Sequence, residues 1–347
     1  MGERTELLAC VDETGNFDCP SEVLGVGGPV LAVDSKTEGA LEAMLRRALP
    51  YIPFPPHAAH LNLRSYHALS WRRLRPAKQE KLRGAFPNLA AVEKVLLARS
   101  DLPDILKHPL ALPEIHDLKD CDQWFRRNEP DSYSLLGEVL EEVQQRGLYF
   151  LKDVARHMNG KLVAVVKLPG SALATRSDAS ADQYLVMLEF YLEHLLLLYE
   201  APGASTHITL RLSGRKVHLG PNGVLVELTR EHVEALLAKV RAKGVGDGVE
   251  VECRAPEPFD AYMPAGLAVA DMAMNRLRFI VPRAETWNEF RQLAKGHIGL
   301  PVEVRVPGMG GLPTIAFAGP SEVQGLARES QDRWSAALIA RRTVEEA

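Results

Sequence analysis

Residues 6–16 read ELLACVDETGN, and this stretch decides the fold. An apolar run ends at Val11 and is followed by Asp, Glu, Gly and Asn, which are turn-forming residues. A second apolar run, rich in glycine and β-branched residues, occupies 23–33. We therefore expect an antiparallel hairpin whose first strand ends at Asp12. Such a hairpin predicts a mixed sheet, because a purely parallel sheet contains no hairpin.

Strand-like and helical patterns alternate downstream of this hairpin. The segment KLVAVVKL, residues 161–168, is typical of a buried strand. Further strands are expected over 207–212 and 249–253, and helices over 35–49, 180–200, 229–243 and 264–279. This alternation predicts an α/β protein, in which helices cover the faces of the sheet.

The expected domain organisation has one main domain and two additions. Residues 1–279 form the α/β domain, and a helical insertion at about 78–159 interrupts it. Residues 280–347 form a C-terminal appendage with short strands at 302–306 and 314–317 and a closing helix at 321–346. The appendage is rich in glycine and proline, and we regard it as a candidate docking surface for a protein partner.

Composition and charge exclude several classes of protein. The 347 residues are 46% hydrophobic and 25% charged, as in an ordinary globular protein. The formal net charge is −4, so an anionic partner would need a local basic patch or a bound metal. Four scattered cysteines predict neither a disulfide framework nor a zinc site. We find no signal-peptide pattern and no bilayer-length apolar stretch, so we expect a cytoplasmic protein without membrane contact.

Two segments carry acids that could hold a cation. Asp12 and Glu13 follow an apolar strand, and Gly15 would let a ligand approach the backbone closely. The same residues also suit a plain hairpin turn. Asp271 lies in GLAVADMAMN, residues 266–275, where an ionised carboxylate is costly unless it is paired or binds a metal. The alternative for Asp271 is a position on the solvent-facing stripe of that helix.

These two segments resemble the motifs of a known family. VDETGNF, residues 11–17, and GLAVADMAMNRLRF, residues 266–279, are similar to the opening DESG and closing GLQLADxxA motifs of an uncharacterised bacterial family of domains of unknown function, number 3800 in that series. The order of the intervening segments is similar too, so the resemblance covers about residues 5–280. It implies an RNase H-like fold, in which Asp12 and Asp271, with Glu13 as a further candidate, bind Mg²⁺ or Mn²⁺.

The chain departs from this family at one strand. Family members often end that strand with Asp, whereas residues 208–215 read ITLRLSGR and contain no acid. Glu189 or Glu193 on the preceding helix could supply the missing oxygen, or they could form only the polar side of an amphipathic helix. Because two-metal phosphoryl chemistry needs several hard oxygen ligands, the residues predict one metal ion more directly than two.

Histidines and a basic run provide candidate contacts beyond the acids. His60, in a cluster with His57 and His67, could assist proton transfer, although such histidines are commonly surface residues. Seven cations lie within residues 64–83, with Tyr66 and Trp71 between them. This run could follow a nucleic-acid backbone or form a solvated helix face. The candidate nucleic-acid contacts are Arg72, Arg73, Arg75 and Lys78.

Together these observations favour a metal-dependent nuclease or phosphodiesterase with an RNase H-like core. Asp12 and Asp271 would hold the metal, Glu13 or Glu189 would complete the site or orient water, and His60 would transfer a proton. The alternative is a non-catalytic module of the same fold that binds nucleic acid or a protein in a larger assembly. The chain has no phosphate-binding GxxxxGK[ST] motif, dinucleotide-binding GxGxxG motif or GxSxG nucleophile elbow.

Overall fold

The computed structural model describes residues 4–15, 17, 23–33, 37–49, 56, 100, 123, 126–128, 130–167, 182–200, 205–219, 223–257, 263–283, 287–306 and 314–318. The chain divides into two units, one formed by residues 1–42 with 151–347 and the other by residues 43–150. Several predicted features lie outside the described residues. These are His60, the candidate contacts Arg72, Arg73, Arg75 and Lys78, and the expected closing helix at 321–346.

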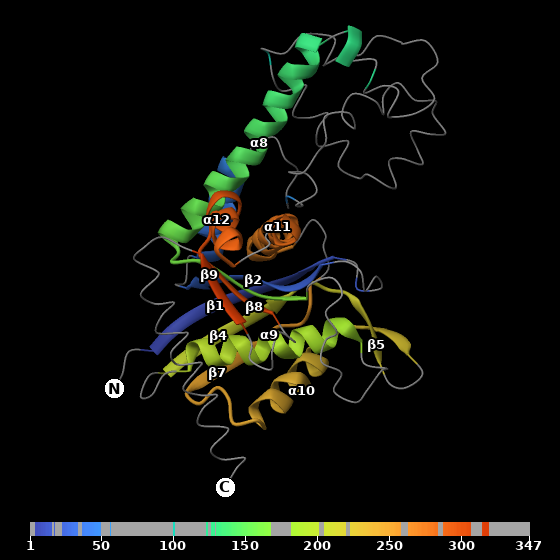
Figure 1. The fold of residues 1–347 in the computed structure, drawn as a ribbon. Coiled ribbons are helices and arrows are strands. Elements are labelled where there is room, and N and C mark those ends of the chain that lie inside the picture. The colour runs from blue at the N-terminus through green and yellow to red at the C-terminus, as the bar shows by residue number, and fades with distance from the viewer. Residues whose placement is uncertain are drawn as a thin grey trace. The chain divides into compact units, whose positions relative to one another are not determined.

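A seven-stranded mixed sheet forms the centre of the first unit (Figure 1). Its strands are β1 (Arg4–Thr14), β2 (Leu24–Ala32), β3 (Lys161–Lys167), β4 (Ser205–Leu212), β7 (Val249–Cys253), β8 (Val302–Val306) and β9 (Thr314–Ala318). They lie in the order β7-β4-β1-β2-β3-β8-β9, and only β2 and β9 run against the other five. The predicted α/β class and mixed sheet are confirmed.

The predicted hairpin is also present, with a longer first strand than expected. β1 and β2 pair antiparallel from Leu7 opposite Ala32 to Thr14 opposite Gly25. Asp12 lies within this ladder, opposite Gly27, so it does not end the strand. The acids of the ELLACVDET stretch are therefore held by regular strand geometry and not by a loop.

Helices cover both faces of the sheet. α9 (Gln183–Tyr199) and α10 (Arg230–Arg241) lie on one face, and α11 (Ala265–Ile280) and α12 (Trp287–His297) lie on the other (Figure 1). α9 begins at Asp182, whose carboxylate accepts the backbone N–H of Tyr184 at 2.8 Å. Such a cap satisfies donors that the first turn of a helix leaves unpaired.

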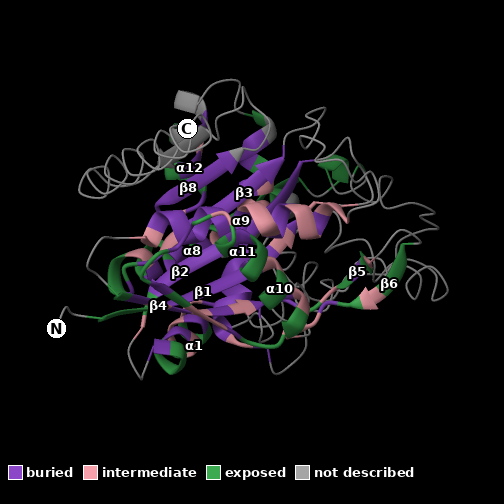
Figure 2. Ribbon diagram, turned by 90° about the horizontal axis from the view of Figure 1, so that it is seen from below, coloured by how far each residue is buried: buried purple, intermediate pink, exposed green. Residues whose placement is uncertain are grey.

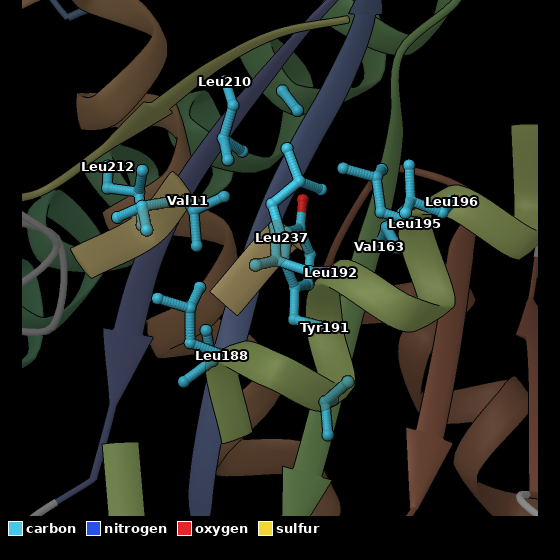
Figure 3. Close-up of a cluster of buried hydrophobic side chains, with 14 of the residues drawn as sticks. Val11, Val163, Leu188, Tyr191, Leu192, Leu195, Leu196, Leu210, Leu212 and Leu237 are labelled. Carbon is cyan, nitrogen blue, oxygen red and sulfur yellow. The ribbon is translucent and has the colours of Figure 1, made fainter. Parts of the chain in front are cut away.

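The main hydrophobic core lies between the sheet and α9. Leu7, Ala9 and Val11 of β1 point to this face, because side chains alternate along a strand. Figure 3 shows Val11 in the same cluster as Leu192 of α9 and Leu237 of α10. α9 is apolar almost all round because the strands cover one side of it and α10 packs on the other. Each such buried leucine stabilises the fold by about 2 kcal/mol.

Two further helices cross the boundary between the units. These are α1 (Thr37–Ala48) and α8 (Pro130–His157), and α8 is the described part of the expected helical insertion. In the second unit, Arg146 and Glu142 form an i,i+4 ion pair at 2.9 Å on α8. None of the helices that the structure describes is both long enough and apolar enough to span a bilayer.

The structure adds elements that the sequence analysis did not predict. A separate hairpin of β5 (Lys216–Leu219) and β6 (Val224–Glu227) follows β4, and most of its residues are exposed (Figure 2). α12 and the short 3-10 helix η2 (Val281–Arg283) follow α11. The strands that we assigned to a C-terminal appendage, β8 and β9, extend the central sheet from β3. The strands on the C-terminal side of the expected boundary at residue 280 therefore belong to the same sheet as the strands of the expected main domain.

Small residues bring α11 very close to β1 and β2. A Cβ built on Gly266 would overlap the Sγ atom of Cys10. A Cβ built on Gly28 would overlap the carbonyl oxygen of Cys10 and would lie 3.0 Å from the Cβ of Ala270. The helix can lie this close only because glycine has no side chain at these contacts.

We predict that Gly266→Ala destabilises the protein by about 1–2 kcal/mol. Overpacking against Cys10 costs about 1–3 kcal/mol, and the higher helix propensity of alanine returns at most about 1 kcal/mol. Cys10→Ala removes the sulfur, so the double variant should recover part of the loss. Urea unfolding of the two single variants and the double variant measures this coupling.

Gly39→Ala is the matched control. Gly39 also lies in a helix, α1, but a Cβ there would meet no atom within 4 Å. This variant should gain up to about 1 kcal/mol from helix propensity alone. Equal effects of the two substitutions would show that α11 does not depend on the contact with Cys10.

Candidate functional site

Asp12 and Glu13 lie near the carboxyl end of β1, on opposite faces of the sheet. Val11 faces α9, so alternation directs Asp12 toward α11 and Glu13 toward α9. Both side chains are largely removed from water, Asp12 more so than Glu13. The two carboxylates therefore lie on either side of the end of β1, and both can act on a group bound beyond that end.

Asp271 lies at the level of Asp12 on α11. Its neighbour Ala270 packs on Gly28, and Gly28 is next to Gly27, the strand partner of Asp12. The Asp271 side chain is buried, so it does not lie on a solvent-facing stripe of the helix. Its negative charge contributes to raising the pKa of both Asp12 and Glu13. The three predicted acids of β1 and α11 are thus close enough for their charges to affect one another.

Ser213 links the two acids of β1. Its hydroxyl donates to Asp12 Oδ1 at 2.5 Å and lies 3.3 Å from Glu13 Oε2. Its backbone N–H donates to the Val11 carbonyl oxygen at 3.0 Å, which fixes the end of β4 against β1. Ser213 stands directly after β4, and residues 208–215 contain no acid. A neutral hydroxyl therefore takes the place that a further carboxylate could occupy.

Arg215 is the cation that pairs with Glu13, at 3.1 Å from Nη1 to Oε1. Its guanidinium also lies over the ring of Tyr184, 4.3 Å from the ring centre, and 4.9 Å from the centre of the Phe17 ring. The start of the β5–β6 hairpin is held to α9, because the backbone N–H of His218 donates to Asp182 Oδ2 at 2.6 Å. These contacts give Arg215 a defined position beside the acids.

Burial dominates the electrostatics of the group. Removal from water raises the pKa of Asp12 well above its ordinary value, and the negative charges of Glu13 and Asp271 raise it further. Burial also raises the pKa of Glu13, and this rise is opposed by Arg215 and by the Ser213 hydroxyl. Asp12 consequently retains a proton at pH values where an exposed aspartate is ionised.

The oxygen atoms of this group fit a hard divalent cation. Mg²⁺ binds proteins through one or two carboxylates and keeps several of its water molecules. Asp12 and Asp271 could supply those carboxylates, with the Ser213 hydroxyl nearby. Within the described ranges, no three His, Cys, Asp or Glu side chains form a group that could hold a metal ion. An ion bound by Asp12 and Asp271 would complete its coordination with water.

Glu189 is not part of this group. It accepts hydrogen bonds from Lys239 and Lys243 of α10, each at 2.7 Å. Partial burial acts to raise the pKa of Glu189, but the two lysines lower it below its ordinary value. Glu193, the other candidate on α9, contacts Lys243 and Arg305. Both glutamates thus join α9 to its neighbours, on the face of the sheet away from Asp271.

Sequence reasoning missed Arg215 and Tyr184 as parts of the site. The available signal was the SGR triplet, residues 213–215, directly after a strand that pairs with β1. Tyr184 gave no separate signal, because it stands on the apolar face of a helix. Comparisons with protein-family models, with curated proteins and with solved structures find no match to this chain.

We predict that Asp12→Asn stabilises the protein, and more so as the pH rises. The folded-state pKa of Asp12 is raised, so between its unfolded and folded pKa values the folded protein binds more protons than the unfolded chain. Stability is therefore lost as the pH rises through that interval, by about 1.4 kcal/mol for each pH unit of the interval. Because asparagine does not titrate, the variant does not lose this stability as the pH rises.

Urea unfolding at about pH 4, 5.5 and 7 tests this prediction. Asp247→Asn, at an exposed aspartate, is the control for the change of residue type alone. An Asp12→Asn variant that is less stable than the parent at neutral pH would contradict the argument.

Proposed function

We propose that this chain has an RNase H-like core and hydrolyses phosphodiester bonds at a divalent-metal site formed by Asp12 and Asp271. The observation that carries the proposal is the grouping of Asp12, Glu13 and Asp271 from β1 and α11, which are more than 250 residues apart in the sequence. Buried groups of like charge with strongly shifted pKa values are concentrated at functional sites.

The strand order supports the RNase H-like assignment. β1, β2 and β3 form an antiparallel meander, and β4 and β7 are added in parallel on the other side of β1. The order β3-β2-β1-β4-β7, with only β2 reversed, is that of an RNase H-like sheet. In this chain β8 and β9 extend the sheet beyond β3.

The position of the acids in the sheet supports a ligand site. The chain builds the sheet on one side of β1 and then continues on the other side, so the direction of building changes at β1. In open α/β sheets, ligands bind beyond the carboxyl ends of the strands at such a point. Asp12, Glu13 and Ser213 all lie at the carboxyl ends of β1 and β4.

Each residue of the group has a proposed role. Asp12 and Asp271 hold Mg²⁺ or Mn²⁺, an ion that would polarise a phosphoryl oxygen and lower the pKa of a bound water. Glu13, whose pKa burial raises, accepts a proton from the attacking water at a carboxylate oxygen. Ser213 holds Asp12 in place. His60 remains a predicted proton-transfer residue, and Arg72, Arg73, Arg75 and Lys78 remain predicted contacts of the nucleic acid.

A second candidate function is a non-catalytic module that binds nucleic acid or a protein. Ser213 favours it, because a neutral hydroxyl stands where another acid would strengthen metal binding. The two candidates differ in whether the unaltered protein binds a divalent ion at Asp12 and Asp271.

Calorimetric titration with Mn²⁺ tests the metal site directly. We predict one site in the unaltered protein and at least a tenfold loss of affinity in Asp12→Asn and in Asp271→Asn, since each removes a charged ligand. Glu189→Gln is the matched control and should bind as the parent does, because Glu189 contacts lysines of α10. If the parent takes up no Mn²⁺ at about 1 mM, the binding module becomes the better conclusion.

Ser213→Asp separates the two candidate functions. It places another carboxylate beside Asp12, so we predict Mn²⁺ affinity at least tenfold higher than in the parent. Ser213→Ala, which removes the hydroxyl without adding charge, should not increase affinity. Hydrolysis of labelled DNA and RNA oligonucleotides by the parent supports the enzyme. Hydrolysis that appears only in Ser213→Asp would mean that the natural chain is a binding module.

A further inference from the structure

Arg215 is held at the site from several directions. Glu13 fixes Nη1 at 3.1 Å, and the Lys216 carbonyl oxygen accepts a weaker hydrogen bond from Nε at 3.3 Å. The rings of Tyr184 and Phe17 flank the guanidinium at 4.3 and 4.9 Å. Cation–π contacts of this kind favour a fixed orientation of an arginine. The guanidinium is thus oriented before any ligand arrives.

Part of this guanidinium remains available to a ligand. A guanidinium carries five N–H donors, and the recorded contacts of Arg215 involve Nη1 and Nε. Within the part of the chain that the structure describes, Nη2 makes no hydrogen bond or ion pair. The side chain is 20% exposed, so solvent and solutes reach it.

A carboxylate site that acts on a phosphate needs such a cation. In their ionised forms Asp12, Glu13 and Asp271 repel a phosphate anion, and this repulsion is strong where burial excludes water. Arginine is suited to offset it, because its planar fork can donate two parallel hydrogen bonds to phosphate oxygens. Arg215 lies beside Glu13 and Tyr184, at the edge of the acidic group.

The hydroxyl of Tyr184 is a second feature that points to a ligand. It is fully buried and has no hydrogen-bond partner among the described residues, although buried hydroxyls are normally paired. It lies within range of the charges of Glu13, Arg215 and Asp12. The Tyr184 hydroxyl, at the same end of the sheet, is therefore suited to donate a hydrogen bond to an acceptor atom of a ligand.

We propose that Arg215, positioned by Glu13 and Tyr184, binds a phosphate oxygen of the substrate beside the carboxylates. The inference rests on the proposed function and names the residue that recognises the anionic part of the substrate. In this arrangement Glu13 serves as the counter-ion of Arg215 while no phosphate is bound. Arg215 is then a substrate-binding residue, and its removal should weaken anion binding without removing the metal ligands.

Titration of the full chain with inorganic phosphate in the presence of Mg²⁺ provides the test. We expect Arg215→Gln to weaken phosphate binding at least tenfold and Arg215→Lys to weaken it less, since lysine keeps the charge but lacks the fork. Arg254→Gln, which removes an exposed arginine paired with Glu252, is the matched control and should leave the affinity unchanged. Circular dichroism and thermal melting confirm that each variant is folded.

Mn²⁺ titration of the same variants separates the two proposals. Retained Mn²⁺ binding in Arg215→Gln with weakened phosphate binding supports the inference. Equal phosphate affinity in the parent and Arg215→Gln, equal losses in Arg215→Gln and Arg254→Gln, or no phosphate binding by the parent would each overturn it. A parent that binds phosphate through Arg215 but takes up no Mn²⁺ would overturn the proposed metal-dependent hydrolysis and leave the anion site standing.

Discussion

The close contact of α11 with β1 and β2 is the constraint on which the candidate site depends. Gly266 and Gly28 leave room for the Cys10 sulfur and the Ala270 methyl group, so the helix axis lies near the sheet. Only at this short separation can a carboxylate on α11 share an environment with one on β1. The same packing excludes water, and exclusion of water is the largest contribution to the raised pKa of Asp12. The close contact of α11 with β1 and β2 thus produces both the tight apolar packing and the burial that makes Asp12 costly to ionise.

Periodicity in the sequence predicted the elements of the core well. The strands at 249–253 and 302–306 have the expected bounds, and α11 differs from the prediction by one residue at each end. Periodicity could not predict which strands are neighbours, because that depends on contacts between distant residues. For this reason β8 and β9 were assigned to an appendage, although β8 pairs with β3. The exposed four-residue strands of the β5–β6 hairpin are too short to show a pattern.

The sequence predicted some residues of the candidate site and missed others, and the difference between the two sets has a physical reason. Asp12 and Asp271 stand out because acids are rare in apolar segments, and their shared environment was expected from a family resemblance. Glu189 was a reasonable candidate on sequence grounds, but its environment is set by Lys239 and Lys243, which lie about 50 residues away along the chain. Ser213 and Arg215 acquire significance only because β4 pairs with β1, a register that no local pattern reveals.

The position of β1 between β2 and β4 has a consequence for the order in which the molecule is made. Its first neighbour, β2, follows within the next 20 residues, but its other neighbour, β4, begins only at Ser205. During synthesis one edge of β1 in the β1–β2 hairpin therefore stays unpaired until β4 has been made, when most of the chain has emerged. Long-range pairing of this kind slows folding, and unpaired strand edges promote association with other chains. Asp12 keeps β1 charged during this interval, because the burial that favours its protonation arises only when α11 packs on β1.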